Sequence, residues 1–294
     1  MPLSELPDLD TDIRELRAAV ATELADGGSR HLLRLTDEEI AVLDPESLKE
    51  CVAPTPRLTE LSEQEREWTY ATALRSLVSR EAVDVANIEE LDALIRRTEG
   101  TPEADRPSNV DLDLRMTTDV SLVLTLRRTA ERALVAEQHT AGGTTHTVVY
   151  GHTPGLYLVE RVTGGGLHMF SLAASAADAA EVVRLAVDPF EIADKDGPVR
   201  QLTPQQIAAQ DVGSRLGQAI DSALVVGQVV RLADVPGPLL TTYATDREVW
   251  TVYVERPDAP DGIEARPVGP RTLGTMLEAL LTLPEPLPEP GEAA

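Results

Sequence analysis

Two stretches of this sequence repeat the same order of patterns at a nearly constant spacing. Each has a Val-Glu-Arg tripeptide, a loop, an alternating apolar segment and a helical segment. In order, they are Val159-Glu160-Arg161, 167–172 and Leu185, and then Val254-Glu255-Arg256, 263–268 and Leu281. The offset is 95 residues for the tripeptides and 96 for the later segments, so one loop residue accounts for the difference. Because a repeated unit buries its apolar face against a neighbour, the spacing predicts two related lobes, with chance similarity as the alternative.

Alternating apolar and polar residues predict strands throughout the repeats and before them. The expected strands cover 120–127, 134–138, 145–150, 156–161, 167–172, 224–232, 239–244, 249–255 and 263–268. Helices are expected where cap residues precede a period of 3.6, at 175–187, 203–221 and 270–283. Gly164, Gly165 and Gly166 form a turn into one of these strands, because no helix or phosphate-loop lysine follows them.

The first hundred residues have a helical pattern instead. Ser62 and Glu65 form a capping box, which predicts a helix over 62–80. Its buried stripe is expected to contain Trp68, Ala71, Leu74, Leu77 and Val78. A second capping box at Asn87 and Glu90 is followed by a linker over 99–110.

We therefore expect an α+β protein with a mainly antiparallel sheet built from two quasi-repeated β-meander-plus-helix lobes. The expected parts are a helical N-terminal segment at 1–98, a first lobe at 111–190, a helix plus second lobe at 200–283, and a disordered, acidic, proline-rich tail at 284–294.

Composition excludes several classes of partner and site. A formal charge of −24 repels nucleic acid, and only 3% of residues are aromatic, so few side chains can stack on bases. Cys51 is the single cysteine, which excludes an internal disulfide and a thiolate-rich zinc site. No run of 18 apolar residues and no signal peptide are evident, so we expect a bacterial protein of the cytoplasm with no membrane contact.

No pattern typical of an active or metal site stands out. His146 and His152 share one face if a single strand spans them, but they are expected to be surface or turn residues. His139 and His168 have no partner that the sequence identifies. Asp8, Asp10 and Asp12 lack the glycine and glutamate of a calcium loop, and favour a helix N-terminus. We expect no catalytic residue, metal or cofactor.

One part of the sequence resembles a known family. The stretch 61–83, with a Glu-Arg pair followed by spaced alanine, leucine and arginine, and the stretch 88–95 are similar to two helices of the actinobacterial EspG family. The segments 122–128, 133–138 and 263–280 are similar in style to its sheet and final helix, although Glu81 stands where the family pattern has glycine. This resemblance implies a quasi-duplicated α+β fold and a cytoplasmic chaperone that shields a helical substrate of type VII secretion.

The functional expectation is non-covalent binding of a protein client through a sheet face or edge. The loop and strand after the glycine turn are the expected contact, with Gly164, Gly165, Gly166, His168 and Phe170 as partner-binding residues. The alternatives are an acidic immunity or regulatory protein that neutralises its partner, and an enzyme using scattered carboxylates. The oligomeric state stays open.

Overall fold

A computed structural model describes residues 9–45, 52–59, 61–85, 89, 114–153, 155–208, 213–232, 237–260 and 262–282. The predicted capping box at Asn87 and Glu90, the linker at 99–110 and the tail at 284–294 lie outside these residues.

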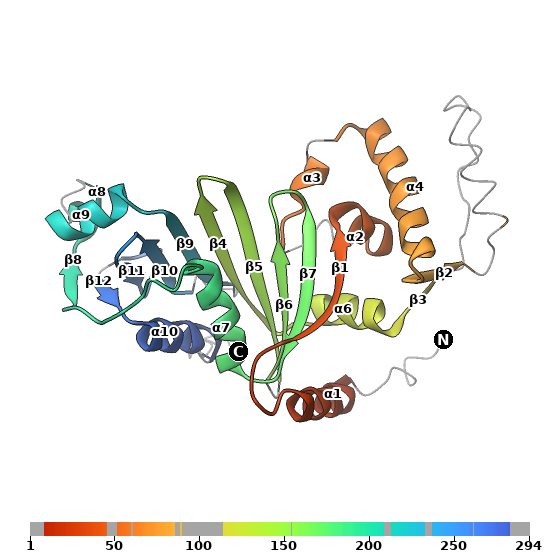
Figure 1. Ribbon diagram of the computed structural model, residues 1–294, viewed down its shortest axis with the longest axis horizontal. Helices are drawn as coiled ribbons and strands as arrows, with labels where there is room; N and C mark the ends of the chain where they lie inside the picture. The colour runs from red at the N-terminus through yellow and green to blue at the C-terminus, as the bar shows by residue number, and fades with distance from the viewer. Residues whose placement is uncertain are drawn as a thin grey trace, which may run out of the picture.

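Ten strands form one antiparallel sheet, in the order β1-β7-β6-β5-β4-β9-β10-β11-β12-β8 (Figure 1). Their bounds are β1 Arg30–Thr36, β4 Arg132–Thr140, β5 Gly143–His152, β6 Leu156–Val162, β7 Leu167–Ala173, β8 Arg200–Leu202, β9 Val225–Leu232, β10 Leu239–Ala244, β11 Val249–Val254 and β12 Ile263–Val268. A separate two-stranded sheet pairs β2 (Val83–Val85) with β3 (Leu114–Met116).

The sheet consists of two meanders that meet at its centre. β4 to β7 form one meander and β9 to β12 the other, and the antiparallel pairing of β4 with β9 joins them edge to edge. A helix precedes each meander, another follows it, and an additional strand lies at each outer edge, β1 beside β7 and β8 beside β12. The predicted fold class, including the repeated lobes, is confirmed.

The helices divide into those before and those after the meanders. Their bounds are α1 Leu9–Glu23, α2 Asp37–Leu43, α3 Pro56–Thr59, α4 Glu63–Ser79, α6 Thr118–Arg128, α7 Ala176–Val187, α8 Pro204–Ala208, α9 Ser214–Asp221 and α10 Pro270–Thr282. α7 and α10 follow the meanders, pack against each other, and cover the central strands β4 and β9 on one face of the sheet. This closed face holds a large apolar core that includes Val183, Leu273 and Leu277.

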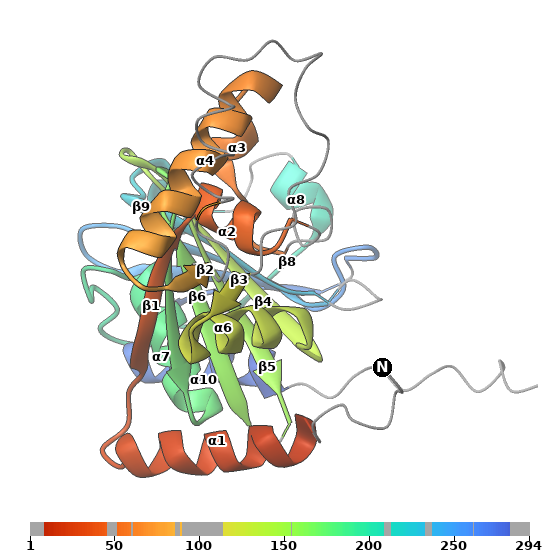
Figure 2. The same cartoon turned by 90° about the vertical axis from the view of Figure 1, so that its right-hand side faces the viewer.

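The opposite face is covered at its two ends by different helices. α6 packs over β1 and β6, and α2 and α4 extend this cover, while α9 lies over β10 (Figure 1). Phe170 and Leu126 belong to the core at the first end, and Leu216 and Trp250 to the core at the second. α1 runs along one end of the strands (Figure 2).

Several expected elements are wrong. The segment 120–127 is not a strand but most of α6, because Thr117 caps a helix whose last turn carries Arg127 and Arg128. The N-terminal segment is not wholly helical, since it contributes β1 to the main sheet. The helix expected over 203–221 contains α8 and α9, and Gly213, with φ +83°, directly precedes α9.

The helix over 62–80 is confirmed as α4, with its Ser62–Glu65 capping box. Its predicted buried stripe is wrong at Trp68, which is 54% exposed, whereas Leu74 and Leu77 are buried. After α4 the chain turns at Glu81, whose φ of +61° lies in the left-handed region that favours glycine. In the part of the chain that the structure describes, no helix is long and apolar enough to span a membrane.

Candidate functional site

The centre of the sheet has one closed face and one open face. Along β9, the residues facing α7 and α10 are buried, as at Val225 and Val229. Their neighbours facing the other way are partly or fully exposed, in the order Val226, Gln228, Val230 and Leu232. Within the described ranges, helices therefore cover only one side of the central strands.

The exposed residues continue onto both neighbours of β9. On β4 they are Val135, Glu137 and His139, and on β10 they are Leu239, Thr241 and Tyr243, all partly exposed. We call these residues of β4, β9 and β10 the open strip. α6 bounds it on one side and α9 on the other, because each of these helices packs over its own end of the sheet.

Beside α9 the open strip deepens into an apolar groove of about 390 Å³. α8 and α9 line one wall and β10 to β12 the floor, and the lining residues are Ile207, Leu216, Gly217, Ile220, Asp221, Leu239, Thr241, Tyr243, Val252, Val254 and Ile263. Polar contacts anchor α9 here. Arg215 lies over the Trp250 ring at 5.7 Å, and its Nη2 is 2.6 Å from Glu248 Oε2. The groove therefore has a fixed wall and an apolar floor.

Three polar side chains lie close together near the tip of the β4–β5 hairpin, two of them in the open strip and His146 beside it on β5. Glu137 lies opposite His146 across the two strands, and His139 lies two residues further along β4. Glu137 Oε1 is 3.3 Å from His139 Nε2 and 3.7 Å from His146 Nε2. His139 Nδ1 also lies 3.1 Å from Thr144 Oγ1. The carboxylate is thus close to two imidazoles while its side chain stays 38% exposed.

A buried ion network lies under α6, at the first end of the sheet. His168 contacts two carboxylates, with Nε2 2.6 Å from Asp37 Oδ1 and Nδ1 2.5 Å from Glu160 Oε1. Arg127 Nε and the Tyr150 hydroxyl donate to Glu160 Oε2 at 3.0 and 2.7 Å. The imidazole thus links two carboxylates and the guanidinium pairs with one of them, so these four groups are charge-balanced when His168 is protonated.

The pKa shifts in this network favour that charged state. Burial disfavours protonation of His168, but its hydrogen bonds to Asp37 and Glu160 outweigh burial and raise its pKa above the ordinary 6.5. For Glu160 burial acts to raise the pKa, and the charges of Arg127 and His168 with the Tyr150 hydrogen bond outweigh it and lower the pKa. Because every ionised member is buried, the network fits a structural role.

The structure separates the five predicted partner-binding residues. Gly164 and Gly165 are exposed at a turn, and their role in binding stays a prediction. Gly166 is buried against Asp37, and its carbonyl accepts a hydrogen bond from the Asp37 amide at 2.9 Å. His168 and Phe170 have no exposed surface, so their side chains offer no contact to a partner in this structure.

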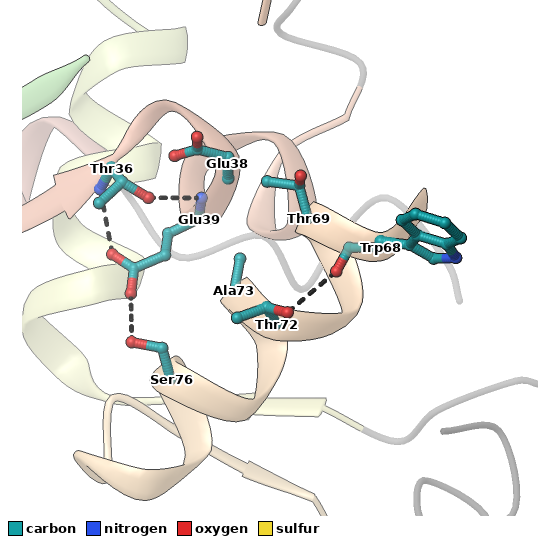
Figure 3. Close-up of a pocket in the computed structure, with 8 residues that line it drawn as sticks. All are labelled: Thr36, Glu38, Glu39, Trp68, Thr69, Thr72, Ala73 and Ser76. Carbon is teal, nitrogen blue, oxygen red and sulfur yellow. Dashed lines mark hydrogen bonds between the residues drawn. The ribbon is translucent and has the colours of Figure 1, made fainter. Parts of the chain in front are cut away.

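A polar cleft of about 410 Å³ lies between α2 and α4 (Figure 3). Glu39 spans its floor, accepting hydrogen bonds from the Thr36 amide at 3.0 Å and the Ser76 hydroxyl at 3.0 Å. Arg80 also donates to Glu39, at 2.7 Å. Trp68 lies at one end of the cleft and points away from Glu39 (Figure 3). These contacts hold α4 against α2 and leave the Trp68 ring on the surface.

The histidines expected at the surface or in turns have different environments. β5 spans both His146 and His152, which puts them on the same face of the sheet. His146 is partly exposed on the open strip side. His152 is 1% exposed and so is not a surface residue, but its carbonyl accepts a hydrogen bond from the Gly155 amide at 2.7 Å, which places it at a turn, the other position expected. Within the described ranges, no group of three or more His, Cys, Asp or Glu side chains is arranged to hold a metal ion. The Glu137 cluster lies at the polar part of the open strip, beside Gln228.

The open strip was missed by the sequence interpretation, and the signal was weak. Residues on both faces of β9 are apolar, so alternation alone does not say which face a helix covers. Comparison of the chain with protein-family models and with curated proteins finds no match.

Proposed function

We propose that this protein is a non-catalytic module that binds another protein on the open strip. The observation that carries the proposal is the partly exposed centre of a sheet, half of whose side chains are aliphatic, opposite a face that α7 and α10 cover. Monomeric proteins rarely leave contiguous apolar surface uncovered, and such surface commonly marks a protein-binding site. Most side chains of the strip are aliphatic or hydroxyl-bearing, which supply contact area instead of reactive groups.

The dimensions of the strip favour a helical ligand. Three neighbouring strands span roughly 10–15 Å at about 4.8 Å per strand, which matches the diameter of one α-helix at about 10 Å. The groove beside α9 can receive larger apolar side chains of such a helix. A helix laid between α6 and α9 would bury the strip as α7 and α10 bury the opposite face.

The resemblance to EspG proteins suggests the class of client. On that basis we propose a cytoplasmic chaperone that shields a helical secretion substrate. The two joined meanders agree with the layout that the resemblance implies. The backbone at Glu81 supports it too, since this residue takes a glycine-like conformation at the position where the family pattern has glycine.

Affinity purification from the native host tests the proposal. The tagged chain should recover a client in a fixed stoichiometry, and Leu232→Asp should abolish recovery because it puts a charge in the apolar strip. Leu185→Asp is the matched control, because Leu185 on α7 and Leu232 on β9 are both 41% exposed but lie on different surfaces. Equal recovery by both variants would contradict the strip as the binding face.

Salt dependence separates this proposal from an acidic protein that neutralises a basic toxin. Apolar capture should change little between about 0.05 and 0.5 M NaCl, apart from any single ion pair. Neutralisation through the net charge of −24 should weaken steeply over the same range. If affinity falls steeply with salt, and Leu232→Asp binds the partner with the same salt dependence, the neutralising function would be favoured.

A further inference from the structure

Glu137 is the one carboxylate of the open strip, level with the uncharged Gln228 and Thr241 and flanked by aliphatic side chains further along the strands. It lies on β4, and its cross-strand neighbour on β9 is the uncharged Gln228. Val135 on the same strand and Val226 and Val230 on β9 surround it on the open face. Any segment that covers the strip must also cover Glu137.

Covering this carboxylate is costly without a cation. An ionised carboxylate moved out of water loses several kcal/mol unless hydrogen bonds and an opposite charge replace the solvent. The nearest imidazoles replace it only in part, because their Nε2 atoms lie 3.3 and 3.7 Å from Oε1. Burial lowers the pKa of His146, against the opposing effect of Glu137 and with the added effect of His139, so this ring is mainly neutral near pH 7. A cationic group on the ligand would supply the remaining charge.

We propose that Glu137 selects the ligand of the open strip, which is an amphipathic helix with an arginine or lysine within its apolar face, paired with this carboxylate. The inference rests on the proposed function of the strip. Arginine fits best, because its planar guanidinium can donate twice to one carboxylate.

A displayed library of amphipathic helices tests this proposal on the full chain. The apolar positions are fixed at helical spacing and all others are randomised, and binders are selected on the wild type and then screened against Leu232→Asp. Helices that lose binding to Leu232→Asp are strip-dependent. We expect them to share an arginine or lysine at one position, and to lose about tenfold or more in affinity when it is changed to glutamine.

The Glu137 variants then identify the residue responsible. With Glu137→Gln, changing the basic residue of the helix to glutamine should cost almost no affinity. A selection on Glu137→Lys should yield helices with an acidic residue at that same helix position. Glu278→Gln is the matched control, because it makes the same charge change at a partly exposed residue of α10, away from the strip. It should retain the wild-type preference.

The outcomes distinguish this inference from the proposed function. Strip-dependent helices without a shared basic residue, or with the same preference in Glu137→Gln, would overturn the role of Glu137 and leave the strip as a binding face. If no selected helix depends on Leu232, both the proposed function and this inference fail. A photo-crosslinker placed at Gln228 that reacts only with the chain's own residues would also overturn them, because the strip would then be occupied internally.

Discussion

At the residue scale, the buried network around His168 couples the fold to pH. The folded-state pKa of His168 lies above its ordinary value of 6.5. Its contribution to stability is therefore complete below about pH 6.5 and is lost as pH rises through the raised pKa. For Glu160, whose pKa is lowered from 4.5, the contribution is present above about pH 4.5 and is lost as pH falls through the lowered pKa. The network is thus strongest between these two transitions.

We expect His168→Gln to destabilise the protein by about 3–5 kcal/mol near pH 6, because two buried carboxylates lose their shared cation. The difference from the wild type should shrink toward high pH, where His168 itself loses its proton. Urea unfolding between pH 6 and 9 measures this. His139→Gln, which changes a histidine with an exposed side chain, is the control and should lower the free energy of unfolding only slightly. A pH-independent difference would contradict the charged state of His168.

The backbone at Gly166 gives a second prediction at this scale. Its φ is +74°, and an added Cβ would lie 2.7 Å from Asp37 Oδ2. Gly166→Ala should therefore destabilise by roughly 1–3 kcal/mol. Gly274→Ala is the contrasting variant, since no heavy atom beyond the adjacent residues and the helix backbone lies within 4 Å of its Cβ position in α10. It should raise stability by about 0.5–1 kcal/mol, and thermal unfolding of both variants checks the pair.

The sequence could not predict the ion network. His168 sits in an alternating strand beside Phe170, a pattern that specifies a strand but no partner. Asp37 is 131 residues away from His168, and only the pairing of β1 with β7 brings the two together. The local turn at the three glycines was predictable, because glycine tolerates φ > 0 where few other residues do.

At the element scale, α6 shows why a short apolar run is ambiguous. The residues 120–127 alternate as a strand would, and that interpretation puts Val123 on the polar side. In the helix Val123 is fully buried, and the cap at Thr117 is what decides the element. β1 was not expected from the sequence, because its residues do not alternate regularly between buried and exposed positions. Its pairing with β7 also contains a register shift, which interrupts the alternation.

Val123→Ala separates the two interpretations of this segment. Because Val123 lies on a buried helix face, its truncation to alanine should lower the free energy of unfolding by about 2 kcal/mol. The loss comes from the methyl groups no longer buried and from the cavity left behind. Ser121→Ala, at a partly exposed position of the same helix, should change stability by less than about 0.5 kcal/mol. Chemical denaturation of the two variants is the measurement, and equal costs would contradict the helix.

The end of α4 gives a further prediction for an element. The Ala82 amide donates to Leu77 O and the Glu81 amide to Val78 O, the two hydrogen bonds of a Schellman motif. Glu81 holds the left-handed position in it, with φ +61°. Glu81→Gly should therefore raise the free energy of unfolding by up to about 1 kcal/mol, whereas Glu81→Val should lower it. Thermal melts of the pair test this, and a loss of stability in Glu81→Gly would contradict the assignment.

At the scale of the whole molecule, the β4–β9 pairing makes one sheet of the two lobes. We expect a single unfolding transition, because neither meander can lose its central strand without exposing the core under α7 and α10. Trp250, which is buried in the second meander, reports on that half in a Trp68→Phe background. Its fluorescence and the far-ultraviolet circular dichroism should change at the same urea concentration. Separate midpoints would show that the lobes are independent.

The repeated meanders were predictable because each has its own local pattern, and the boundaries of their eight strands agree closely with the expected ones, whereas the short edge strand β8 was not expected. Their union was not predictable, because the register between β4 and β9 joins residues about 90 positions apart. The sequence also does not indicate which face of the sheet centre is exposed. That depends on tertiary packing, because α7 and α10 pack together over the centre of one face whereas α6 and α9 pack at the ends of the other.

The two walls of the open strip differ, although they occupy corresponding places in the two lobes. α6 is anchored by Arg127 to a buried carboxylate on β6, whereas α9 carries an apolar groove and is anchored by Arg215 at the surface. A segment lying between them therefore meets dissimilar chemistry on its left and right flanks. Reversing its chain direction would exchange those flanks, so on the proposed function we expect a bound segment to prefer one orientation.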